Sequence, residues 1–151
     1  MHLLKYHHLL FDFLKNLKRS GFSGHINLFG FLPSLVYSDI LSEVPAVDSI
    51  AVGEFEHSLA ELARALGKRE PLLNIPGIAI RFQGGNVAFQ PRPPEKRPDV
   101  FAFPHRLALG TTVIIQASRG CYNRCSFCLV PAFDGHGGGW RGRSPENIFS
   151  E

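Results

Sequence analysis

The amino-acid sequence predicts an α/β fold: a parallel sheet with covering helices, then a hairpin and a linker, and finally a short strand–loop–helix segment. Three observations lead to this prediction. Helical and strand-like patterns alternate along the first part of the chain, an order that is typical of parallel sheets. Alternating apolar residues then flank the sequence Gly84-Gly85-Asn86, which indicates a hairpin. A proline-rich stretch separates these elements from a second β-rich run.

An amphipathic helix is expected at the start of the chain. Apolar side chains recur there at steps of three and four residues, which places them on one face of a helix. The helix is expected to end in a basic segment just before Gly21. The apolar residues on its expected inner face are Leu3, Tyr6, Leu10, Phe13, Leu14 and Leu17.

Two short apolar stretches are expected to form the parallel strands. They are HINLF at 25–29 and VDSIAV at 47–52, and they end at Gly30 and Gly53. Ligands of open parallel sheets bind at the carboxyl ends of the strands, where glycine lets the backbone approach a ligand closely. Gly30 and Gly53 are therefore candidate binding residues, with tight strand-to-helix turns as the alternative explanation.

Two further helices are expected around these strands. One opens at Pro33, between the strands, and the other runs from about Glu54 to Leu66. Their apolar residues are Leu35, Val36, Ile40 and Leu41 in the first, and Phe55, Leu59, Leu62, Ala63 and Leu66 in the second.

The character of the sequence changes at about residue 71. The hairpin comes first, and residues 91–106 then contain five prolines, which predicts an extended linker. The run TTVIIQAS at 111–118 is suited to a buried strand, and the segment after it is expected to be a loop. A final helix is predicted with Ser144 as its N-cap and Pro145 at its first position.

Composition argues against several classes of function. The net charge of +3, from 16 basic and 13 acidic residues, is too weak to indicate binding to nucleic acid. The sequence has no apolar run of the roughly 18 residues that a membrane helix needs. Its N-terminus also lacks a signal-peptide core, so the sequence predicts a cytoplasmic protein with reduced thiols.

Basic residues are frequent near the cysteines. Arg119, Arg124, Arg141 and Arg143 stand against one acidic residue, Asp134. This composition is typical either of a cationic site for an anionic ligand or of a solvated basic loop.

The segment RGCYNRCSFC contains all three cysteines of the chain, Cys121, Cys125 and Cys128. An odd number of closely spaced thiols indicates metal or redox chemistry in a reducing compartment. A zinc site would need a fourth ligand, for which His105 and His136 are candidates. A 4Fe–4S cluster could instead be held by three cysteines, which would leave one iron open.

This motif resembles the cluster motif of radical S-adenosylmethionine (radical SAM) enzymes. The spacing C-x3-C-x2-C, the Arg-Gly before it and the aromatic Phe127 before the last cysteine all agree. The segment SRGCYNRCSFC followed by WRGRSPENI is also similar to the first strand, loop and helix of the barrel of these enzymes. The resemblance implies that Cys121, Cys125 and Cys128 ligate three irons of a 4Fe–4S cluster. S-adenosylmethionine would chelate the fourth iron and be cleaved reductively to a 5′-deoxyadenosyl radical. Phe127 is implied either to lie near the adenine or to pack in a core.

The order of the upstream elements is similar to the subgroup of these enzymes with an N-terminal cobalamin-binding domain. The resemblance then implies three parts. They are the C-terminal part of a Rossmann-like cobalamin-binding domain at 1–70, a hairpin and linker at 71–110, and the start of a truncated radical SAM partial barrel at 111–151.

Gly30, Gly53 and Glu54 would lie on the cobalamin side of this arrangement. The chain departs from the subgroup at two positions, because Phe29 and Phe55 stand where glycines are usual. The bulk of Phe29 would lie where the nucleotide tail of the corrinoid passes.

The resemblance implies a radical SAM enzyme with a 4Fe–4S cluster and S-adenosylmethionine as cofactors. With cobalamin as a third cofactor, the reaction would be a methyl transfer from methylcobalamin. The implied partners are a small-molecule substrate and an external one-electron reductant of the flavodoxin or ferredoxin type. No membrane or nucleic-acid partner is implied, and no side chain is assigned a catalytic role.

The chain is expected to be an internal fragment of such an enzyme and to be inactive alone. A complete eightfold barrel takes about 250 residues, and the stretch from Thr111 to Glu151 is far shorter. Two other functions stay open: a small zinc-binding module, and a non-catalytic remnant that serves in partner contact.

Overall fold

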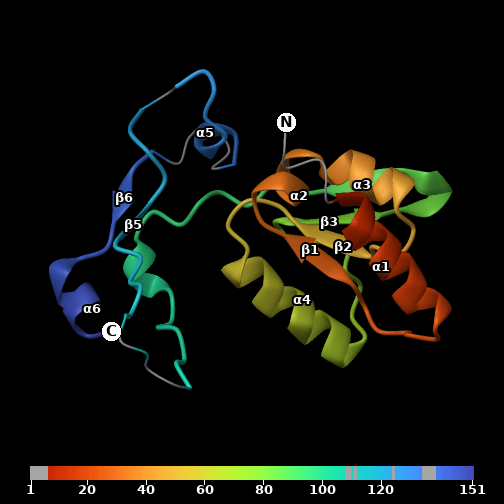
Figure 1. The fold of residues 1–151 in the computed structure, drawn as a ribbon, viewed down its shortest axis with the longest axis horizontal. Helices are drawn as coiled ribbons and strands as arrows, with labels where there is room; N and C mark the ends of the chain where they lie inside the picture. The colour runs from red at the N-terminus through yellow and green to blue at the C-terminus, as the bar shows by residue number, and fades with distance from the viewer. Residues whose placement is uncertain (1–6, 108–109, 111, 124, 134–138) are drawn as a thin grey trace. The chain divides into compact units, whose positions relative to one another are not determined.

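The computed structural model describes residues 7–107, 110, 112–123, 125–133 and 139–151 (Figure 1). The chain divides into two compact units, Met1–Arg92 and Pro93–Glu151. In the described part of the chain, no helix has both the length and the apolar character required to span a membrane.

The first unit contains a four-stranded mixed sheet with the strand order β1-β2-β3-β4. The strands are β1 (Asn27–Phe29), β2 (Ser49–Ala51), β3 (Ile78–Arg81) and β4 (Val87–Phe89). β1 and β2 are parallel, whereas β3 is antiparallel to β2 and β4 is antiparallel to β3. The α/β class, the parallel pair and the hairpin, which turns at Gln83–Gly85 (η2), are confirmed. The sheet is not wholly parallel, because the hairpin extends it.

Helices cover both faces of this sheet. They are α1 (His7–Arg19), α2 (Phe31–Leu35), α3 (Tyr37–Glu43) and α4 (Glu56–Lys68). Figure 1 shows α4 on one side of the sheet and α1 and α3 on the other. Neighbouring residues of β2 explain this layering, since successive side chains of a strand point to opposite faces. Ile50 packs with residues of α1 and α3, and Ala51 packs with residues of α4.

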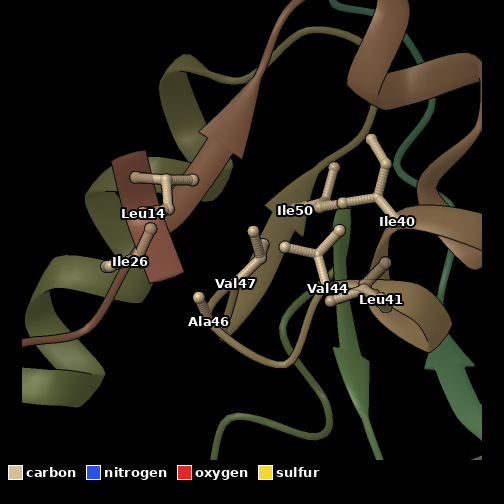
Figure 2. Close-up of a cluster of buried hydrophobic side chains, with 9 residues drawn as sticks. Leu14, Ile26, Ile40, Leu41, Val44, Ala46, Val47 and Ile50 are labelled. Carbon is tan, nitrogen blue, oxygen red and sulfur yellow. The ribbon is translucent and has the colours of Figure 1, made fainter. Parts of the chain in front are cut away.

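The larger hydrophobic core lies between the sheet and helices α1 and α3. Figure 2 shows Ile40 and Leu41 of α3 near Ile50 of β2. Full burial of each such leucine, isoleucine or valine contributes roughly 1.5–3 kcal/mol. The members of this core are Leu14, Ile26, Ile40, Leu41, Val44, Ala46, Val47, Ile50 and Ala79. The smaller core, on the α4 side, consists of Ala51, Leu62, Ala65, Ile75 and Ile78.

Helix α1 meets the sheet through a narrower face than its periodicity predicts. Leu14 is buried and Leu17 packs against the core, as expected. Leu10 and Phe13 are exposed, and Phe11 packs against the core instead, because the contacting face follows steps of three residues through Leu14. Two other expected positions, Leu3 and Tyr6, lie outside the described residues.

The helical segment predicted to open at Pro33 begins earlier, at Phe31, and divides at Val36 into α2 and α3. Pro33 is the third residue of α2, in the first turn, where its missing N–H is tolerated. Ile40 and Leu41 of α3 are buried and belong to the larger core.

In α4, Leu62 is buried, and Phe55 and Leu59 pack against the smaller core as predicted. Ala63 and Leu66 are exposed, so the buried face of α4 is narrower than expected.

The second unit contains little regular structure. Its elements are η3 (Pro98–Val100), β5 (Ser118–Arg119), α5 (Val130–Phe133), β6 (Arg141–Gly142) and α6 (Pro145–Phe149). β5 and β6 form a two-stranded antiparallel ribbon in which Arg119 pairs with Arg141. Helix α6 begins as predicted, because the Ser144 Oγ accepts a hydrogen bond from the Asn147 N–H at 3.2 Å.

The β-rich run TTVIIQAS does not form the buried strand that its composition predicts. Residues 112–117 lie in no helix or strand, and only Ser118 belongs to β5. Ile114 is 86% exposed, and Val113 and Ile115 are exposed as well. The prediction is wrong because a strand becomes buried only when it is paired and covered. In the described part of the second unit, no strand pairs with 112–117.

The assignment of 1–70, 71–110 and 111–151 to parts of a larger enzyme stays a prediction. In the structure, β3 and β4 share one sheet with β1 and β2. The boundary between the compact units falls after Arg92, within the proline-rich stretch.

Candidate functional site: the cysteine loop and the strand-end edge

The cysteine loop directly follows β5 and precedes α5. Its three thiols are free; Cys121 and Cys128 are half-buried, and Cys125 is exposed. The Asn123 N–H donates to the Cys121 Sγ at 3.4 Å, and the Cys128 N–H donates to the Cys125 carbonyl oxygen at 3.0 Å. The loop therefore has local order and presents thiols that solvent reaches.

Proximity in sequence does not by itself gather these thiols into a metal site. Among the described residues, no group of three or more His, Cys, Asp or Glu side chains is placed to hold a metal ion. The donor set nevertheless fits an iron–sulfur cluster, since three soft thiol ligands lie on one short loop. Of the alternative zinc ligands, His105 is exposed and His136 lies outside the described residues.

Phe127, which the resemblance places near S-adenosylmethionine, is 87% exposed. In this structure the ring therefore does not pack in a hydrophobic core. Tyr122, on the same loop, is also strongly exposed. The loop thus combines thiols with accessible aromatic rings.

Two arginines near the cysteine loop line a cavity of about 170 Å³ in the second unit. The Arg119 guanidinium lies 4.2 Å from the centre of the Phe101 ring, and the Arg143 guanidinium lies 5.6 Å from that of Phe103. Arg143 also forms an ion pair with Glu151 at 2.5 Å. Two guanidinium groups therefore line this cavity, but the Glu151 carboxylate neutralises the charge of Arg143.

The charged residues around this cavity are held by specific partners. Glu151 accepts hydrogen bonds from Arg106 and Arg143. Both bonds lower the pKa of its carboxyl group, and the bond from Arg106 has the larger effect. Arg141 is buried and donates to the Glu95 carbonyl oxygen at 2.8 Å. The two remaining charged residues of this region, Arg124 and Asp134, lie outside the described residues.

A second candidate site lies in the first unit, at the carboxyl ends of the parallel strands β1 and β2. Gly30 and Gly53 follow these strands, and we call the two glycine turns the strand-end edge. Their φ angles are 105° and 78°, values that glycine adopts without strain. The Ser34 Oγ donates to the Gly30 carbonyl oxygen at 2.7 Å and accepts from the Gly53 N–H at 3.0 Å. The structure thus brings both predicted glycines to one edge, and Glu54 follows Gly53 in the turn before α4.

Sequence reasoning does not identify Ser34 as part of this edge. A serine in a helix can donate a hydrogen bond to the carbonyl four residues earlier, so the bond from Ser34 to Gly30 could be predicted from the local sequence. Its bond to Gly53 joins residues 19 positions apart and could not be predicted from the local sequence. Ser34 is 7% exposed, so it acts as a buried bridge between the two turns.

Phe29 and Phe55, the two departures from the glycine pattern, contact each other at the same edge. Their ring centroids are 4.4 Å apart, with a tilt of 45° between the planes. Phe29 is 52% exposed, whereas Phe55 is partly buried against the smaller core.

The opposite ends of β1 and β2 carry a polar cluster that sequence reasoning also misses. The His25 Nε2 lies 2.7 Å from the Ser49 Oγ, to which the Asn27 Nδ2 also donates at 2.7 Å. Burial is the main cause that lowers the pKa of His25; Asp48 acts to raise it and Lys18 to lower it. Ser49 is fully buried, so the cluster holds the two strands together and offers no accessible nucleophile.

No family model matches the chain. In sequence it is 31% identical over 131 residues to the anaerobic magnesium-protoporphyrin IX monomethyl ester cyclase of Synechocystis sp., a match that spans 81% of this chain and 26% of the relative. It is 29% identical over 130 residues to an uncharacterised methyltransferase of Pyrococcus horikoshii, over 80% of this chain and 27% of the relative.

The fold matches solved structures of radical SAM proteins. One is the radical SAM methyltransferase TsrM from Kitasatospora setae with tryptophan and a SAM analogue, with a TM-score of 0.74 and 19% identity over 97% of this chain and 30% of that one. Another is the cobalamin-dependent SAM radical enzyme OxsB with aqua-cobalamin and S-adenosylmethionine, with a TM-score of 0.65 and 20% identity over 95% of this chain and 20% of that one.

The chain thus resembles, in fold, the radical SAM enzymes that act with cobalamin, as its cysteine motif and the order of its upstream elements together predict. Its curated relatives are enzymes, a cyclase and a methyltransferase. A third matched structure is TsrM with cobalamin and a [4Fe–4S] cluster, so the three cofactors implied by the sequence are those bound in the neighbours. The chain spans about a quarter of the length of the curated relatives that it matches.

Proposed function

We propose that Cys121, Cys125 and Cys128 bind a 4Fe–4S cluster and leave the fourth iron to S-adenosylmethionine, as part of a radical SAM enzyme. The cysteine loop is the observation that carries this proposal. It offers three free thiols directly after a strand, in a chain with the fold of radical SAM enzymes. Three cysteines form a complete protein set when a cofactor supplies the remaining ligand.

When bound, this cluster supplies the electron for reductive cleavage of S-adenosylmethionine to a 5′-deoxyadenosyl radical. The residues of the loop bind the cluster, orient S-adenosylmethionine and shield it from water. Phe127 covers the adenine and excludes water, a role supported by its exposure beside Cys128. Arg119, two residues before Cys121 in the sequence, adds positive charge to the segment that would hold the anionic cluster.

The substrate in this proposal is a small molecule, and the electron comes from a reductant of the flavodoxin or ferredoxin type in the cytoplasm. The 151-residue polypeptide does not sustain turnover by itself. Residues 112–117 support this part of the proposal, because they pair with no strand in the described part of the second unit. A closed or partial barrel requires such a segment to be paired.

Anaerobic reconstitution of the full chain with iron and sulfide tests the cluster. The wild-type chain is expected to bind about four irons and to show the broad visible absorbance of a 4Fe–4S cluster. Replacing Cys125 by Ala should remove most of the bound iron. Ser126→Ala is the matched control, since Ser126 is an exposed neighbour within the same motif that carries no thiol.

Two results would contradict the proposal. One is equal iron binding by the Cys125→Ala and wild-type chains. The other is stoichiometric zinc without iron, which would indicate the zinc-binding module instead. Turnover is measured separately, as 5′-deoxyadenosine formed under a chemical reductant; sustained formation by this chain would overturn its proposed inactivity.

A further inference from the structure

The residues at the strand-end edge do not fit a corrinoid. In an open α/β sheet, a ligand enters at the carboxyl ends of parallel strands, between the turns that follow them. Here those turns follow β1 and β2, and they contain Gly30 and Gly53. The structure joins these two turns to each other in two independent ways.

An aromatic contact forms the first connection. Phe29 is the last residue of β1 and lies opposite Ala51, the last residue of β2. Its ring rests on Phe55, with 4.4 Å between the ring centroids. Phe55 is anchored, because it packs against the smaller core. The two rings therefore occupy the edge from one turn to the other.

Hydrogen bonds of Ser34 form the second connection. The Gly53 N–H, a donor that a ligand at this edge could use, donates instead to the Ser34 Oγ at 3.0 Å. The Gly30 carbonyl oxygen accepts both the Ser34 hydroxyl at 2.7 Å and the Ser34 N–H at 3.1 Å. These backbone groups are therefore satisfied within the chain, and ligand binding there would have to displace a buried partner.

We infer that the Phe29–Phe55 pair closes the strand-end edge, so that the first unit has the fold of a corrinoid-binding domain but does not bind cobalamin. The pair determines specificity at this edge, and the Ser34 bridge holds the closed turns in place. This inference concerns residues of the first unit alone. It is independent of the cluster proposed for the cysteine loop.

Binding of aquacobalamin to the full chain tests this inference. We compare the wild-type chain with a variant that carries Phe29→Gly and Phe55→Gly, using equilibrium dialysis and the cobalamin absorbance. The wild type is expected to retain no stoichiometric cobalamin, and the double variant to bind at least about tenfold more tightly. The backbone accepts glycine at both positions, since Phe29 ends a strand and Phe55 is the N-cap of α4, although Phe55→Gly also removes a ring that packs against the smaller core.

Phe82→Gly is the matched control, because Phe82 is exposed to nearly the same extent as Phe29, 48% against 52%, but belongs to the hairpin. Far-ultraviolet circular dichroism checks the folding of each variant. If the double variant does not fold, Phe29→Ala alone replaces it, with the same expected direction.

Three outcomes would overturn the inference: stoichiometric binding by the wild type, no gain in binding by a folded Phe29 variant, or an equal gain by Phe82→Gly. Iron is measured in the same samples. If one of these outcomes occurs while iron uptake is normal, the inference about cobalamin is wrong and the proposed cluster is unaffected. If iron uptake fails while the cobalamin results are as expected, the proposed cluster is wrong and the inference about cobalamin is unaffected.

Discussion

Ser34 connects two turns that are distant in sequence, and the residue is buried. Replacing Ser34 by Ala should lower the free energy of unfolding by about 1 kcal/mol or more, because the Gly53 N–H loses its partner. Urea denaturation measures this change. Ser42→Ala is the control, since Ser42 makes the same type of bond, to Ser38 at 2.8 Å, on an exposed face. A loss of equal size in both variants would contradict a bridging role for Ser34.

His25 makes the stability of the first unit depend on pH. Burial lowers the pKa of His25 in the folded state below its usual value of about 6.5. The unfolded chain therefore binds the proton more readily than the folded chain does. The stabilisation that neutral His25 contributes is complete above a pH of about 6.5, and it is lost as the pH falls through the pKa of His25 in the folded state.

The free energy of unfolding should therefore decrease as the pH is lowered from about 7 to about 5. Replacing His25 by Gln should flatten this dependence, as measured by urea denaturation at several pH values. His8→Gln is the control, because His8 is exposed on α1. An unchanged pH profile in the His25 variant would show that another group is responsible.

At the scale of single residues, the sequence predicts groups that depend on local spacing alone. The structure confirms that Gly30 and Gly53 follow the two parallel strands, whereas cluster binding by Cys121, Cys125 and Cys128 stays a prediction. Ser34 and His25 could not be found this way, because their partners lie 19 and 24 positions further along the chain. Only the fold brings them together.

At the scale of elements, Gly77 lets the chain that enters β3 pass close to α4. A Cβ at this position would lie 2.2 Å from the Ser58 Oγ, and the φ angle of 80° is strained for any other residue. Gly77→Ala should therefore destabilise the protein by about 2 kcal/mol or more. Thermal unfolding followed by circular dichroism measures the effect.

Gly67 provides the opposite case in the same unit. It lies within α4, and a Cβ there would meet no atom within 4 Å. Gly67→Ala should stabilise the helix by about 0.5–1 kcal/mol, because alanine loses less conformational freedom on folding. If both glycine variants changed stability in the same direction, the argument from close approach would be wrong.

The helices and strands of the first unit were predictable because their periodicity is a local property of the chain. The mixed sheet was not predictable, since the antiparallel pairing of Ile50 with Ala79 depends on contacts remote in sequence. The same limit explains the error at 112–117. A β-rich composition favours a strand, but the strand also needs a partner, which the described second unit does not provide.

At the scale of the whole molecule, apolar burial is concentrated in one of the two units. Every buried leucine, isoleucine, valine and alanine among the described residues lies between Leu14 and Ala79. The second unit is held mainly by polar contacts, such as those of Glu151 with Arg106 and Arg143. The first unit should therefore supply most of the stability.

A polypeptide of residues 1–92 should consequently unfold in one cooperative transition in urea. A polypeptide of residues 93–151 should show no such transition and should bind a dye specific for exposed apolar surface. The full chain is the control and should show the transition of the first unit. Cooperative unfolding of residues 93–151 alone would contradict the uneven burial described here.

The ribbon of β5 and β6 has a consequence for how the three thiols could bind a shared ligand. Two residue pairs, Ser118 with Gly142 and Arg119 with Arg141, close a loop of 21 residues, from Gly120 to Trp140, that contains all three thiols. Closing a loop of this length costs roughly 3 kcal/mol of chain entropy, which so short a ribbon offsets poorly. A ligand shared by the three thiols would cross-link the loop from inside. Metal uptake and the pairing of β5 with β6 would then be a single coupled equilibrium, in which the affinity for the metal is reduced by the free energy of pairing the two strands.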